Sequence, residues 1–196
     1  GLLIIAGRGG TDNSYEEKPW LHVSVDAGAE GLVYAFLKYL DDDISDAIFI
    51  NGVPINPDEY VKIPDLEPGS EVKLMVAHTS IGIIERTLTV PATVTDLSCG
   101  GDGVLDAWRQ RVEPTLTLTF NNGDADYYIV HVNRWGTGGT DRRSSPIIID
   151  KAESDRFLDP IPQSVSISVR GVNHIDFDDP KLSFSSDFTV EGFESE

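Results

Sequence analysis

Strict alternation of apolar and polar residues is the feature that most limits what this chain can fold into. It is clearest at 20–26 (WLHVSVD) and at 115–120 (TLTLTF). A period of two puts every second side chain on the same face of a strand, so each segment predicts a strand with one buried face and one solvent-facing face. In the first segment, His22 is expected on the solvent-facing face. Helical patterns are scarce, and only 104–112 could form a short helix. The sequence therefore predicts an all-β protein.

The first half carries a recognisable pair of strands. A length of 196 residues allows one large domain or two of about 100 residues each. The segment 60–76 (YVKIPDLEPGSEVKLMV) resembles the strand, Leu-x-Pro-Gly turn and following strand of immunoglobulin-like and fibronectin type III-like sandwiches. Those families place a tyrosine near the position of Val72, and this chain lacks that hydroxyl, so the resemblance implies the topology of such a sandwich and not close kinship. We expect a first β-sandwich domain at 19–95.

The second half resembles a fibronectin type III-like domain in the order of its segments. Its third, sixth and last strands would be 125–132 (ADYYIVHV), 164–173 (SVSISVRGVN) and 182–188 (LSFSSDF). The resemblance implies a second β-sandwich at 114–196, after a linker at 96–113. The expected fold is thus two consecutive immunoglobulin-like or fibronectin type III-like β-sandwich domains, as in a tandem surface protein, preceded by an N-terminal extension strand.

That extension, at 1–18, combines an apolar strand with a glycine-rich tether. Glycine has no side chain and leaves the backbone free to adopt many conformations, so the glycines form a flexible connection and the strand can reach away from its own domain. The strand is formed by Leu2, Leu3, Ile4, Ile5 and Ala6, and the hinge by Gly7, Gly9 and Gly10. Two interpretations remain open, a strand donated to another subunit and the remnant of a secretory signal, and both indicate a location outside the cytoplasm.

The net charge of the chain limits the kinds of binding partner that we expect. A net charge of −18, from 33 acidic and 15 basic residues, repels nucleic acid and anionic membrane surfaces, so we expect neither as a partner. No apolar run approaches the roughly 18 residues of a transmembrane segment. The excess of acidic residues is compatible with calcium binding, with adaptation to high salt, or with a role in colloidal solubility alone. The best calcium candidates are Asp176, Asp178 and Asp179, whose carboxylates follow one another in a loop, and the alternative is a solvated acidic loop.

No catalytic constellation is apparent in the sequence. The four histidines are scattered and none has metal-binding spacing, and the phosphate-binding and nucleophile motifs are missing. The single cysteine, Cys99, excludes an internal disulfide. We therefore expect no catalytic residues and no cofactor apart from calcium, in a protein that is not an enzyme.

These features together predict an extracellular or cell-surface structural subunit. An apolar strand on a flexible joint can complete a neighbour's sandwich by backbone pairing, and repetition of such a contact gives a head-to-tail homo-oligomer, a filament. This assembly logic resembles that of donor-strand pilins. One alternative is a surface-anchored, lipoprotein-like binding module for carbohydrate or a partner protein, although Arg8 stands where a lipoprotein signal would place cysteine. Another is the accessory domain of an enzyme.

Overall fold

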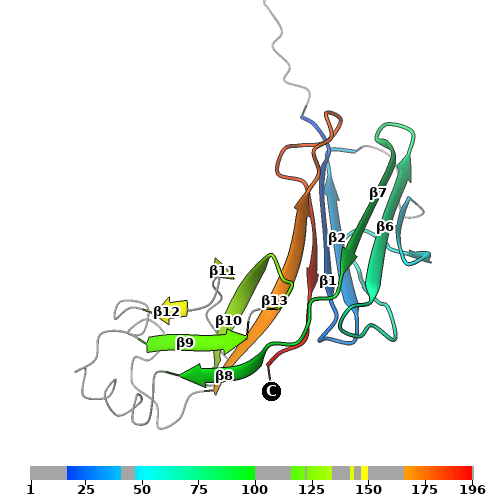
Figure 1. Ribbon diagram of the computed structural model, residues 1–196. Helices are drawn as coiled ribbons and strands as arrows, with labels where there is room; N and C mark the ends of the chain where they lie inside the picture. Colours follow the sequence, from blue (N-terminus) through cyan, green and yellow to red (C-terminus); the bar gives the residue numbers. More distant parts are fainter. Residues whose placement is uncertain are drawn as a thin grey trace, which may run out of the picture.

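The computed structural model describes residues 17–40, 47–99, 116–121, 123–133, 142–143, 147–149 and 166–195. Every regular element in these residues is a β-strand (Figure 1), so the predicted all-β class is confirmed. The strands are β1 (Trp20–Asp26), β2 (Leu32–Lys38), β3 (Ile48–Ile50), β4 (Val53–Pro54), β5 (Tyr60–Lys62), β6 (Glu71–His78), β7 (Gly82–Thr89), β8 (Thr95–Cys99), β9 (Leu116–Asn121), β10 (Tyr127–Asn133), β11 (Arg142–Arg143), β12 (Ile147–Ile149), β13 (Ser166–Asp176) and β14 (Asp187–Glu191).

These strands form three sheets. The largest has seven strands in the order β11-β10-β13-β14-β1-β2-β5, the second has the order β4-β3-β6-β7, and the third has the order β12-β9-β8. The strand order repeats along the chain. In β1–β7 the first, second and fifth strands share one sheet, and the fourth, third, sixth and seventh share another. The strands β8–β14 follow the same scheme: β8, β9 and β12 share one sheet, and β11, β10, β13 and β14 are consecutive in another. We call β1–β7 the first strand set and β8–β14 the second strand set.

The core of the first strand set follows from the alternation in its strands. Leu21, Val23 and Val25 of β1 have no exposed surface, and they pack in one cluster with Leu74 and Val76 of β6 in the facing sheet. The polar residues between them, His22 among them, lie on the opposite face of β1, as predicted. The packing of two sheets through their apolar faces is that of a β-sandwich.

The second strand set has a smaller described core. Leu118 and Phe120 of β9 are buried, and the Phe120 ring meets the Tyr128 ring of β10 edge to face, with 4.9 Å between ring centroids. The Tyr128 hydroxyl accepts a hydrogen bond of 2.7 Å from the amide of Gly123, so this buried ring has a partner for its polar atom. The alternation at 115–120 predicts that its leucines face inward, and the burial of Leu118 confirms this for that residue.

The pair Asn51-Gly52, which follows the apolar segment 47–50, predicts a hairpin turn, and the structure confirms it. Asn51 and Gly52 join β3 to β4 with φ angles of 48° and 80°. Positive φ at both central residues is the conformation of the tightest hairpin turns, and asparagine followed by glycine tolerates it best. The Asn51 side chain donates from Nδ2 to the carbonyl of Glu71 and accepts at Oδ1 from the amide of Lys73, both on β6.

The pairing of the strands crosses the predicted domain division. Residues 95–99, expected at the end of the first domain and in the linker, form the edge strand β8 of the second strand set. At the other end of the chain, β14 pairs with β1 of the first strand set, so 187–191 share a sheet with 20–26. Sequence patterns that are local to each half carry no signal of this pairing.

Candidate functional site

The most distinctive feature of the molecule is β14, because it belongs to both strand sets. On one side it pairs antiparallel with β13, and on the other it pairs parallel with β1, from His22 opposite Asp187 to Asp26 opposite Glu191. Its residues Phe188 and Val190 have no exposed surface and lie in the core of the first strand set. We call the region where β1, β14 and β13 meet the junction.

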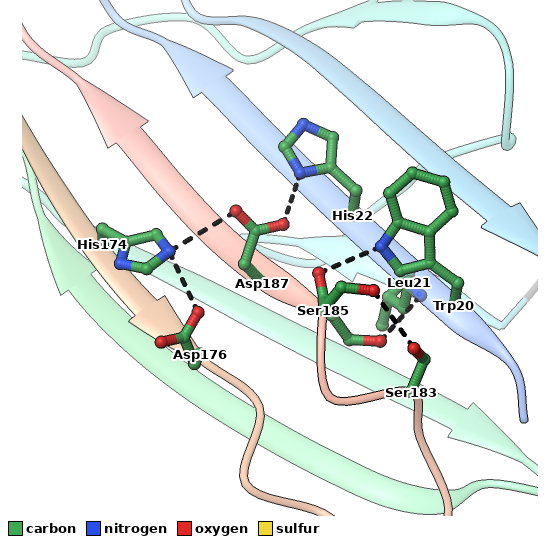
Figure 2. Close-up of polar contacts among 9 residues, drawn as sticks. Trp20, Leu21, His22, His174, Asp176, Ser183, Ser185 and Asp187 are labelled. Atoms are coloured by element: carbon green, nitrogen blue, oxygen red, sulfur yellow. Dashed lines mark hydrogen bonds and ion pairs between the residues drawn. The ribbon is translucent and has the colours of Figure 1, made fainter. Parts of the chain in front are cut away.

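Contacts along the junction continue beyond the paired residues at both ends. The amide of Ala27 donates to the carbonyl of Glu191 over 2.9 Å, which extends the ladder past the end of β1. At the other end, the segment before β14 holds the start of β1 through three further bonds. The amide of Ser183 donates to the Pro19 carbonyl over 2.7 Å. Trp20 Nε1 donates to the Ser185 carbonyl over 3.0 Å, and the amide of Leu21 donates to Ser186 Oγ over 3.1 Å (Figure 2).

One carboxylate on the outer face of the junction contacts two histidines. His22 Nδ1 lies 2.6 Å from Asp187 Oδ1, which is a short hydrogen bond. His174 Nε2 lies 3.5 Å from Asp187 Oδ2 and 3.3 Å from Asp176 Oδ1 (Figure 2). Asp187 and His22 are partly buried, with side-chain exposures of 19% and 34%. The four side chains therefore link β1, β14 and β13 on this face.

A second ionic group lies on the same three strands, toward the other end of the junction. Arg170 of β13 donates from Nη1 to Asp26 Oδ2 over 2.9 Å, and its Nη2 forms an ion pair with Glu191 Oε2 at 2.7 Å. All three side chains are at most about a quarter exposed. Burial raises the pKa of Glu191, Arg170 acts to lower it, and the nearby Asp26 acts to raise it. The guanidinium thus holds two carboxylates from different strands together.

His131 of β10 lies near this group. Burial lowers the pKa of His131, and the positive charge of Arg170 lowers it further. Its Nε2 is buried and has no hydrogen-bond partner among the described residues. Protonation of this ring therefore disfavours the folded state.

We expect His131→Leu and His131→Gln to flatten the dependence of stability on pH. A histidine with a folded-state pKa below its unfolded value of about 6.5 destabilises the protein as the pH falls below that value. The wild-type protein should therefore lose more stability between pH 7.5 and 5.5 than either variant, as measured by urea unfolding at each pH. The titration of Glu191, whose pKa is raised, changes stability with pH in the opposite direction, and we expect this contribution to be the same in all three proteins. A slope that both variants retain in full would exclude His131 as its source.

The backbone is tightly packed where the first strand set leads into β8. A Cβ atom at Gly171 of β13 would stand 2.8 Å from the Ala125 Cβ and 3.0 Å from the Pro91 Cβ. Close to it in the same strand, Asn173 is buried and donates from Nδ2 to the Thr89 carbonyl over 2.8 Å. The connection between the strand sets is therefore embedded in the junction.

Gly171→Ala should destabilise the protein by about 1–3 kcal/mol, because an added methyl overpacks this contact. Gly123→Ala is the matched control, since its Cβ would meet its nearest neighbour, the Ala92 Cβ, at an ordinary 3.4 Å. Thermal and urea unfolding of both variants measure the difference. Equal stability of the two variants would show that Ala125 and Pro91 can move away from the added methyl group at little energetic cost.

The residues predicted from the sequence divide into two groups. Leu2 to Ala6 and the hinge at Gly7, Gly9 and Gly10 lie outside the described residues, so their role stays a prediction. Of the calcium candidates, Asp176 contacts His174, Asp178 is exposed, and Asp179 Oδ1 accepts a 2.8 Å bond from the Lys181 amide. The described part of the chain holds no group of three or more histidine, cysteine or acidic side chains placed to bind a metal. Calcium binding at these aspartates stays a prediction.

The junction residues were missed by reasoning from the sequence. His22 and His174 looked scattered because 152 positions of chain separate them, and only the register of β1, β14 and β13 brings both to Asp187. No spacing motif could have indicated this. The one signal was indirect and held for His22 alone, which stands at a polar position of an alternating segment, whereas His174 follows the predicted segment 164–173.

Comparisons with known proteins add no family to this description. No protein-family model matches the sequence, and neither a curated protein nor a solved structure matches the chain. Among the described residues, no helix has the length and apolar character needed to cross a membrane.

Proposed function

We propose that the chain is a non-enzymatic extracellular structural subunit that assembles head to tail by donating Leu2 to Ala6 to a neighbouring subunit. Its body would be two consecutive sandwiches of the immunoglobulin-like or fibronectin type III-like kind. The strand order supports this for the first set, because its first, second and fifth strands share one sheet while its third, sixth and seventh share the other.

The observation that carries the proposal is the way β14 completes the first strand set. A strand from outside β1–β7 pairs beside β1 and places Phe188 and Val190 in the core. Donor-strand assembly needs the same two elements, backbone pairing at a sheet edge and apolar side chains that enter a core. The edge of β1 is already covered by β14, so a neighbour's strand would pair at another sheet edge, and among the described strands these are β5, β11, β4, β7, β8 and β12.

Deletion of residues 1–10 should leave a folded monomer that no longer forms filaments. The reason is that the donated strand is lost while every described contact of the body remains. Negative-stain imaging and light scattering measure assembly, and circular dichroism measures folding.

A pair of point variants sharpens this test. Ile4→Asp places a charge in the donated strand and should abolish assembly, whereas Thr11→Asp places the same charge beyond the glycines and should not. Filaments that persist after the deletion, or an equal loss in both point variants, would overturn the proposal.

A surface-anchored, lipoprotein-like binding module for carbohydrate or a partner protein is the second candidate. The aromatic side chains on the outer face of the large sheet favour it. Tyr60 is 69% exposed and its ring lies 5.2 Å from that of Tyr34, and Trp20 meets Phe36 edge to face at 5.0 Å. Aromatic rings on a flat sheet can stack on sugars. Binding to a glycan array that Tyr60→Ala abolishes would favour this function over the first.

A further inference from the structure

We propose that β1 and β14 form a tension-bearing clamp through which the chain carries load between its two ends. The inference rests on the proposed role as a structural subunit and assigns that role a mechanical element. It follows from three observations: the direction of the two strands, the continuity of their contacts, and the burial of β14 in the first core.

The direction of the strands decides how load would act on them. β1 is the first described strand and β14 the last, and they are neighbours in one sheet with parallel direction. The chain enters β1 at one end of this pair and leaves β14 at the other end (Figure 1). Tension between the chain ends therefore pulls the two strands past each other along their length. All hydrogen bonds between them then bear load together, whereas bonds pulled apart from one end would break one after another.

The contacts between the two strands form an uninterrupted series. Five residue pairs are in register, and the bond from Ala27 to Glu191 adds one more at the end of β1. Side chains reinforce both ends, with His22 bonded to Asp187 at one and Arg170 bridging Asp26 and Glu191 at the other. Hydrogen bonds to charged groups are the stronger ones, so the reinforcement lies at the positions where fraying would begin.

Both strands are also held on their far sides. β1 pairs with β2 over seven residue pairs, and β14 pairs with β13 over five. Sliding of β14 would in addition withdraw Phe188 and Val190 from the first core. Because β14 is the seventh strand of the second set, neither set can be extended before the clamp opens. A single energy barrier, the separation of β1 from β14, thus opposes the mechanical unfolding of both strand sets.

The experiment is single-molecule unfolding of the full-length chain, tethered by its two ends and held at constant load. We expect one step that extends both strand sets together. Forced unfolding reports the unfolding rate, so loss of a contact within the clamp should shorten the lifetime under load. His22→Ala removes the 2.6 Å bond to Asp187 and should shorten that lifetime about tenfold, the factor that corresponds to a lost charge-assisted hydrogen bond.

Asn51→Gly is the matched control for this variant. It removes two side-chain hydrogen bonds to β6 in the other sheet and keeps a residue suited to positive φ. It should lower the stability measured with urea but leave the lifetime under load unchanged. Release of the two strand sets in separate steps, or equal shortening by both variants, would overturn the clamp. Single tethered molecules do not depend on assembly, so failure to form filaments would remove the proposed assembly and leave this result standing.

Discussion

Phe188→Ala is expected to destabilise the whole protein by about 3–5 kcal/mol, the cost of removing a fully buried aromatic side chain from a core. Phe188 has no exposed surface and is the largest of the fully buried side chains among the described residues. It stands on β14, so its loss should weaken the first core and the sheet that continues into the second strand set. Urea unfolding gives the change in free energy, and hydrogen exchange shows where protection is lost. We expect faster exchange both in β6 and in β10.

Phe184→Ala provides the matched control. Phe184 belongs to the loop that leads into β14 but is 94% exposed, so its truncation should change stability by no more than about 0.5 kcal/mol. The variants thus compare the same substitution four positions apart. Loss of protection in β6 alone, with β10 unchanged in Phe188→Ala, would mean that the strand sets unfold independently and that β14 does not couple them.

Local structure was predictable because its causes are local. The alternation at 20–26 defines both the strand β1 and its buried face, with Leu21, Val23 and Val25 inward. Asn51 and Gly52 define a turn for the same kind of reason, since positive φ is a property of two adjacent residues. Each of these predictions needed only the chemistry of neighbouring positions.

The junction was not predictable because its causes are distant in the chain. His22 and Asp187 are separated by 165 positions, and a parallel pair has no hairpin turn to signal it. The alternation at 187–191 would suit either strand set equally well. The segment 182–188 was expected as the last strand, yet the strand begins only at Asp187, because Leu182 and Ser186 belong to a loop whose polar atoms bond to β1 and to the loop itself.

The second large change in stability is expected at the ionic group that Arg170 forms with Asp26 and Glu191, at the other end of the junction. Arg170→Met is expected to cost about 3–5 kcal/mol at pH 8, because it leaves two partly buried carboxylates facing each other without their cation. Lys62→Met is the control: Lys62 and its partner Glu30 are 59% and 78% exposed, so water and salt screen this pair and its loss should change stability far less than Arg170→Met does. Urea unfolding of both variants measures the difference.

The pH dependence of Arg170→Met identifies the cause of its effect. Burial already raises the pKa of Glu191, and Arg170 is the group that lowers it, so the substitution should raise this pKa further. A carboxyl with a raised folded-state pKa destabilises the protein above its unfolded pKa of about 4.3, and that stability is regained as the pH falls through the folded value. The deficit of Arg170→Met should therefore be smaller at pH 5 than at pH 8.

Addition of Glu191→Gln to Arg170→Met separates charge from packing. If the cost comes from the uncompensated carboxylate, the double variant should recover much of the lost stability at pH 8 and lose the extra pH dependence. If the cost comes from the aliphatic part of the arginine, which methionine largely replaces, neither change should occur. Recovery in the double variant would show that the cation, by neutralising charges on β1 and β14, allows these two strands to lie side by side.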